Sequence, residues 1–131
     1  MRYLVILLPV LLLTACKSNP FAEDVPPKLF NNVQAYEDTV RWGDLDNIYA
    51  FVSPDRRAEL EVQSGLDNVR VTGYDDTGLR QIDEQRWAVT AVIDYVLTDR
   101  QVVRQVVDNQ VWKTEDEGES WYLDSPVPRF R

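Results

Sequence analysis

The chain has 131 residues, of which 22 are acidic and 14 are basic, so its formal net charge is −8. An acidic surface disfavours nucleic acid as a partner and disfavours electrostatic binding to anionic lipid. Histidine, the commonest general base near neutral pH and the commonest metal ligand, is absent from the sequence. The composition therefore predicts no metal and no cofactor, and the sequence identifies no catalytic residue.

The first sixteen residues have the layout of a secretory signal. Arg2 is followed by an uncharged run from residue 3 to residue 15, which is shorter than the roughly 20 apolar residues of a membrane-spanning helix. The run ends in Leu13-Thr14-Ala15-Cys16, and Cys16 is the one cysteine of the chain. An ordinary signal peptide with an incidental cysteine would leave an unpaired thiol in an oxidising compartment, which is uncommon.

The stretch Leu13–Cys16 resembles the lipobox of bacterial lipoproteins. The resemblance implies that the Cys16 thiol takes a diacylglycerol and that residues 1–15 are removed as a signal peptide. Several acyl chains, palmitate among them, anchor a domain to a membrane far more stably than one chain does. Lys17 stands where an aspartate would favour retention in the inner membrane. The expected location is therefore the outer membrane, with the domain facing the periplasm.

Residues 16–28 are expected to form an acylated tether, because Asn19-Pro20 and Pro26-Pro27 disfavour both helix and sheet. Residues 29–131 are expected to form a single domain. A formal charge of −9 is expected for the mature chain, since removal of Arg2 leaves 13 basic residues against 22 acidic ones.

Three helices are predicted at the front of the domain. Helical spacing of apolar residues predicts the first over roughly residues 29–42, ended by Gly43. Asp44 is placed to cap a second helix, and Ser53-Pro54-Asp55 is a start signal for a third that runs to Ser64. The expected core positions are Phe30, Val33, Tyr36 or Glu37, Val40, Leu45, Ile48, Phe51 and Val52, with Trp42 and Trp121 as further core side chains.

From residue 68 onward the apolar pattern changes to period two, which is typical of strands. The first strand begins at Val69 and continues to about Asp83 after a bulge near Thr77-Gly78. Long strands are predicted over Trp87–Leu97 and Gln101–Lys113, and a last one over Ser120–Leu123. The sum is an α+β domain in which N-terminal helices pack on a curved, antiparallel, four-stranded meander.

This order of elements, together with Arg41-Trp42-Gly43-Asp44-Leu45-Asp46-Asn47-Ile48, resembles the NTF2-like (SnoaL-like, cystatin-like) cone fold. In that family a Gly-Asp-Leu-Asp turn joins the first two helices, and the resemblance covers most of residues 29–124. Its members include isomerases, hydrolases, binding domains and secretion-system components. The fold therefore does not choose a function.

A tight turn at Asp99-Arg100 predicts the register of the two long strands and pairs Trp87 with Trp112. One face then carries Trp87, Tyr95, Arg104, Asp108 and Trp112. If this face is concave, these residues are candidates for an aromatic-lined pocket with three polar groups. The alternative is a plain packing face, with Asp94, Arg104 and Asp108 in solvent and with Pro54-Asp55-Arg56-Arg57 as a helix start with solvated arginines.

Two functions remain open from the sequence. The first is a membrane-anchored, non-catalytic periplasmic module that binds an envelope protein or a small ligand or assists envelope assembly. The second is a small NTF2-like isomerase or hydrolase with a carboxylate and arginine pocket. The resemblance implies an Asp-Arg-Asp set for one hydrolase branch, and Asp94, Arg104 and Asp108 are of the right types. The predicted register, however, puts Asp94 on the opposite face from Arg104 and Asp108.

Overall fold

The computed structural model describes residues 24–131, so Cys16 and the rest of the predicted signal lie outside the described residues. The helical elements are α1 (Pro27–Trp42), the 3-10 helix η1 (Leu45–Phe51), α2 (Pro54–Arg57) and the 3-10 helix η2 (Leu66–Asn68). The strands are β1 (Val69–Asp76), β2 (Arg80–Gln81), β3 (Arg86–Leu97), β4 (Val102–Lys113) and β5 (Tyr122–Leu123).

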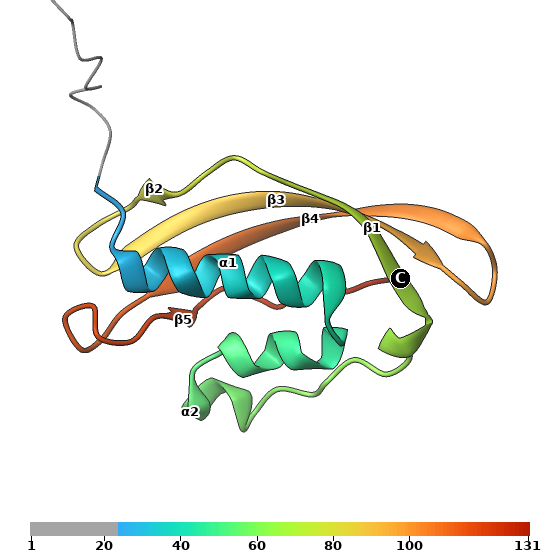
Figure 1. Ribbon diagram of the computed structural model, residues 1–131. Helices are drawn as coiled ribbons and strands as arrows, with labels where there is room; N and C mark the ends of the chain where they lie inside the picture. Colours follow the sequence, from blue (N-terminus) through green and yellow to red (C-terminus); the bar gives the residue numbers. More distant parts are fainter. Residues whose placement is uncertain (1–23) are drawn as a thin grey trace, which may run out of the picture.

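The architecture is α+β, with one antiparallel sheet of five strands. Its order is β1-β3-β4-β5, and β2 pairs with β3 beyond the end of β1. The predicted meander had four strands; residues 77–79 divide the predicted first strand into β1 and β2, which share the same edge of β3. Figure 1 shows α1 lying along the concave side of the long β3–β4 ribbon, which extends past the end of the helix.

The register of the two long strands is confirmed along their whole length. Trp87 pairs with Trp112, and the ladder runs unbroken to Leu97 and Val102. A bulge in β1 places one extra residue, Thr72, between the pairs that β1 makes with β3. The bulge keeps Tyr74 on the inner face of the sheet, where its side chain is buried.

The first helix is confirmed, with a small change in its buried face. It begins at Pro27 rather than residue 29, and the Gly43 N–H closes it by donating to the Thr39 carbonyl at 3.0 Å. Phe30 is half-exposed, and Leu29 takes its expected place in the core. The buried positions Leu29, Val33, Tyr36 and Val40 are spaced by four, three and four residues, as expected of one helix face.

Trp42 was predicted in the core, and this prediction is wrong. Its side chain is 77% exposed, and the Arg41 guanidinium lies 5.1 Å from the centre of its ring. Two residues past Val40, a helical side chain is rotated by about 200° and points away from the sheet. Trp121, in contrast, is a core residue as predicted, at 4% exposure.

The second and third helices differ from the prediction. The second is a 3-10 helix, and the Asp44 side chain makes no capping hydrogen bond. The third ends at Arg57 instead of Ser64. Gln63 explains the early end, because its N–H donates to the Tyr49 hydroxyl and its side chain bonds to both main-chain groups of Phe130. These contacts tie the irregular segment after α2 to the C-terminal residues.

Candidate functional site

The face that carries the candidate residues is the covered one. Every second residue of β3 from Trp87 to Leu97 is buried. On β4 the same face is buried at Trp112, Gln110 and Asp108, whereas Arg104 near the hairpin tip is exposed. The difference follows from the length of the ribbon, since β3 and β4 continue beyond the end of α1 (Figure 1).

The structure therefore separates the predicted site residues. Trp87, Tyr95, Asp108 and Trp112 are 2%, 3%, 2% and 0% exposed, and Asp108 is not in solvent as the packing-face alternative assumed. Arg104 lies four residues from Asp108 along one strand, which is about 13 Å. Asp94 is on the opposite face, where it accepts a hydrogen bond from Gln105 at 2.7 Å. Asp94, Arg104 and Asp108 are thus not brought to one place.

Asp108 instead belongs to a buried hydrogen-bonded cluster, which we call the Asp108 network. Its Oδ2 accepts from the Tyr36 hydroxyl at 2.8 Å and from Gln110 Nε2 at 2.9 Å. Gln110 Nε2 also donates to the Tyr74 hydroxyl at 2.8 Å, and Gln110 Oε1 accepts from Trp112 Nε1 at 3.0 Å. These five side chains come from α1, β1 and β4, so the network fastens the helix to the sheet.

Burial dominates the electrostatics of the network. Loss of solvent raises the pKa of Asp108 to about 6, although the hydrogen bonds from Tyr36 and Gln110 act in the opposite direction. Burial, with a smaller contribution from the nearby Asp108 charge, raises the pKa of Tyr36 well above its usual range. Tyr36 therefore stays a hydroxyl donor at all physiological pH values, while Asp108 changes charge close to neutrality.

Aromatic rings fill the space around this network. The Tyr36, Phe51 and Trp112 rings form three edge-to-face pairs, with centroids 5.3, 5.7 and 6.1 Å apart. Such pairs are favoured by the quadrupoles of the rings and contribute beyond the area that they bury. The Asp108 side chain is 2% exposed, so a substrate cannot reach its carboxylate in this structure.

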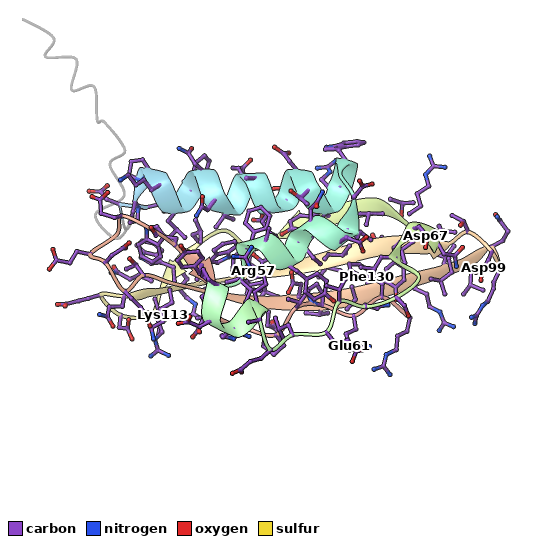
Figure 2. The ribbon with its side chains drawn as sticks, turned by 90° about the horizontal axis from the view of Figure 1, so that it is seen from below. Arg57, Glu61, Asp67, Asp99, Lys113 and Phe130 are labelled. Atoms are coloured by element: carbon purple, nitrogen blue, oxygen red, sulfur yellow. The ribbon has the colours of Figure 1, made fainter. Side chains whose placement is uncertain are left out.

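The C-terminal residues cover the other end of the same face. The Tyr95 hydroxyl donates to the Arg131 carbonyl at 2.7 Å and accepts from the Arg131 N–H at 2.9 Å. The Phe130 ring meets the Tyr95 ring edge-to-face at 5.1 Å. Figure 2 shows Phe130 on the underside of the molecule and Asp99 at the far tip of the hairpin.

The arginines of the predicted third helix are not equally solvated. Arg56 donates to the Leu123 carbonyl at 3.0 Å and to the Ser125 carbonyl at 3.4 Å, and so holds the segment around β5. Arg57 is exposed, as expected.

Sequence reasoning missed three members of the network, namely Tyr36, Tyr74 and Gln110, as polar partners. Gln110 carried a signal, because it stands between Trp112 and Asp108 on the same face of a strand. A polar pair flanked by a tryptophan on a strand predicts a buried network once that face is known to be covered. Tyr36 was assigned to the apolar face of α1, and nothing in the sequence links its hydroxyl to Asp108.

Two further observations concern the kinds of site available. Within residues 24–131, no cluster of three His, Cys, Asp or Glu side chains could hold a metal ion. In the same part of the chain, no helix has the length and apolar character needed to cross a membrane. Comparison with protein-family models and with curated proteins finds no match to this chain.

Proposed function

We propose that this chain is an acyl-anchored lipoprotein of the bacterial cell envelope, and that its domain is a non-catalytic binding or assembly module. The lipobox at Cys16 supports the anchor, and the proline-bearing spacer that follows supports a tether. The first described helix begins at Pro27, which leaves about ten residues between lipid and domain. The expected place is the periplasmic face of the outer membrane.

We also propose an NTF2-like cone as the finer description of the fold. A long helix, a Gly43-Asp44-Leu45-Asp46 turn, short helices and long curved antiparallel strands support it, in that order. In such a cone, the space between helix and sheet is the natural place for a ligand or a reaction.

One observation carries the choice of a binding role over catalysis: the side chains of the domain itself fill that space. Tyr36 and Gln110 donate hydrogen bonds to Asp108 Oδ2. The rings of Phe51 and Trp112 pack against the Tyr36 ring. A general base must come within hydrogen-bonding reach of the proton that it takes. The enzyme alternative would need the Asp108 network to open, whereas a binding module acts through its surface.

The anchor is tested by mass spectrometry of the full chain expressed in a bacterium with two membranes. The mature protein should begin at Cys16 and carry the mass of a diacylglycerol and an amide-linked acyl chain. Cys16→Ala should remain uncut or lose its acyl chains, while the neighbouring Ser18→Ala should be processed normally. A mature chain that begins elsewhere, with a free thiol, would refute the anchor.

The binding role is tested with the acylated protein purified from its own membranes. Asp108→Asn keeps the shape of the network and removes its titratable carboxyl group, so partner binding should be unchanged. If the wild-type protein converts an envelope metabolite and Asp108→Asn does not, that result would instead support the enzyme alternative.

A further inference from the structure

The two edges of the strand β4 differ in how they are paired. One edge pairs with β3 over all 12 residues of the strand. The other edge pairs with β5 at Trp112 and Lys113 alone, and no described segment pairs with it between Val103 and Asn109. We call this unpaired stretch the β4 edge. It leads to the tip of the hairpin, which extends past the end of α1 (Figure 1).

The direction of the main-chain groups along this edge follows from Val111. Its N–H donates to the Ser125 hydroxyl at 3.0 Å, and its carbonyl accepts from the Asp124 N–H at 2.7 Å, so both groups point away from β3. Successive residues of a strand direct these groups to opposite sides. The groups that point outward at the β4 edge are therefore those of every second residue before Val111, namely Val103, Gln105, Val107 and Asn109. No described residue bonds to them.

The side chains of the same four residues are uncharged and lie on the outer face of the sheet, opposite the face that carries Asp108. Val103 and Val107 are 76% and 55% exposed, which makes them the most exposed large apolar side chains of the described strands. Across the ladder they adjoin Val96 and Val92, so a stripe of valine follows the ribbon. A long, apolar and unpaired edge of this kind is a template for pairing with another strand.

The opposite edge of the sheet, on β1, is protected against such pairing. A bulge at Thr72 interrupts the register of β1, and Asp75 and Asp76 stand at its end. Bulges and charged side chains are the usual means by which proteins prevent contact between sheet edges. The β4 edge has neither, because its ladder with β3 is unbroken and its outward side chains are neutral. A second copy of the chain therefore offers one suitable edge, which is again its β4 edge.

We propose that two copies of this chain pair through their β4 edges, antiparallel and about a two-fold axis at Gln105. In this register Val103 lies opposite Val107 of the partner subunit, twice by symmetry, and Gln105 lies opposite its own counterpart. The opposed residues exchange about six main-chain hydrogen bonds. An axis at residue 106 would place both valines opposite polar side chains. An axis at residue 107 would oppose Val103 to Val111, whose main-chain groups are already bonded.

The remaining contacts of this register are compatible with a weak, reversible pair. On the inner face Arg104 lies opposite Val106 of the partner subunit, so no two like charges are opposed. The two domains lie at opposite ends of the joined ribbons, because only the protruding parts of the hairpins overlap. The overlap is short compared with a standard interface of about 1,600 Å², and confinement of both copies to one membrane would raise their effective concentration. This inference rests on the binding role proposed above and names the partner.

The register is tested by disulfide formation in the full chain, purified in a mild detergent with many more micelles than protein molecules. Opposed residues that exchange main-chain bonds have Cα atoms about 5.5 Å apart, which a disulfide spans. Mild oxidation should therefore link Gln105→Cys into a dimer on a non-reducing gel. Asn109→Cys is the matched control on the same edge and face, because its counterpart in the partner lies about 27 Å away. The wild type, oxidised in parallel, controls for any free thiol at Cys16.

Charged substitutions at the opposed valines test the same contact in the Gln105→Cys background. Val107→Lys should weaken pairing by about tenfold, measured as the linked fraction over a dilution series, because the dimer loses two valine pairs. Adding Val103→Glu should restore pairing to within about threefold, since each lysine then lies opposite a glutamate of the partner subunit. Within one chain the two positions are about 13 Å apart. Val62→Lys is the control, because Val62 is 48% exposed and lies on the segment after α2, outside the sheet. It should leave pairing unchanged.

Three results would overturn the proposal. The first is an unlinked Gln105→Cys at about 0.1 mM protein, where even a Kd of about 0.1 mM leaves half of the chains paired; another strand on the edge would give this result. The second is equal linkage of Gln105→Cys and Asn109→Cys, which indicates random collision. The third is an equal effect of Val62→Lys and Val107→Lys, or no recovery with Val103→Glu. Capture of a different partner by the wild type is independent of all three, so self-pairing can fail while the binding role stands.

Discussion

Replacement of Asp108 by asparagine should stabilise the protein at neutral and alkaline pH. Burial raises the pKa of this carboxyl group from 3.8 to about 6. The folded state then binds more protons than the unfolded state between these two values, so stability falls as pH rises through the window. Each pKa unit is about 1.4 kcal/mol, so the ionised group destabilises the folded state by about 3 kcal/mol above that window.

Asparagine is neutral at every pH, and its amide oxygen can accept from both Tyr36 and Gln110. The two proteins should therefore be equally stable at about pH 4. By about pH 8 the free energy of unfolding of the variant should exceed that of the wild type by about 3 kcal/mol. Urea unfolding followed by circular dichroism across this range measures the difference. Asp67→Asn is the control, since Asp67 is exposed and should change stability by less than about 0.5 kcal/mol. A variant that is less stable than the wild type at about pH 8 would refute the reasoning, because hydrogen bonds to the carboxylate would then outweigh its burial.

Three other changes test the packing. Trp112→Ala should cost about 3–5 kcal/mol in urea unfolding, because it empties the centre of the aromatic cluster, while Trp42→Ala should cost less than about 0.5 kcal/mol; equal costs would contradict the assigned core. Tyr95→Phe removes the hydroxyl that binds both main-chain groups of the last residue, so residues 125–131 should become faster to digest with carboxypeptidase, with a stability loss of about 1 kcal/mol. Arg56→Ala should speed hydrogen exchange in β5 by about fivefold, because it removes the hydrogen bond to the Leu123 carbonyl, which is worth about 1 kcal/mol. Unchanged exchange would contradict a structural role for the Arg56 side chain.

The long strands were predictable because one polar turn fixes every pair in a hairpin. Once the loop at Asp99-Arg100 is given, the pairing of Trp87 with Trp112 follows without any tertiary information. The first helix was predictable for a similar reason, since its apolar residues repeat locally and Gly43 ends it. Both are cases in which the decisive interactions lie close together in the sequence.

The errors have the opposite origin. Residues 58–64 have helix-forming composition, but they form a turn and an irregular segment, in which Gln63 contacts Tyr49 and Phe130, residues distant in sequence. Trp42 is apolar and follows a buried helix face, but its position around the helix axis directs its side chain into solvent. Asp108 is a charged strand residue, a type that usually faces solvent, and its burial follows from the elements that cover this face, among them α1 with Tyr36.

The strand register and the Asp108 network act on the same side chain. Trp87 pairs with Trp112 across the two long strands, and Gln110 accepts a hydrogen bond from the Trp112 indole nitrogen. Gln110 also donates to Asp108, which accepts from Tyr36 on α1, so the position of the helix over the sheet is linked to the same ring. The hairpin half of this arrangement is set by residues close together in the sequence, whereas the contact with Tyr36 joins residues 72 positions apart. A single polar contact between distant residues thus completes a core whose strand pairing the sequence already specifies.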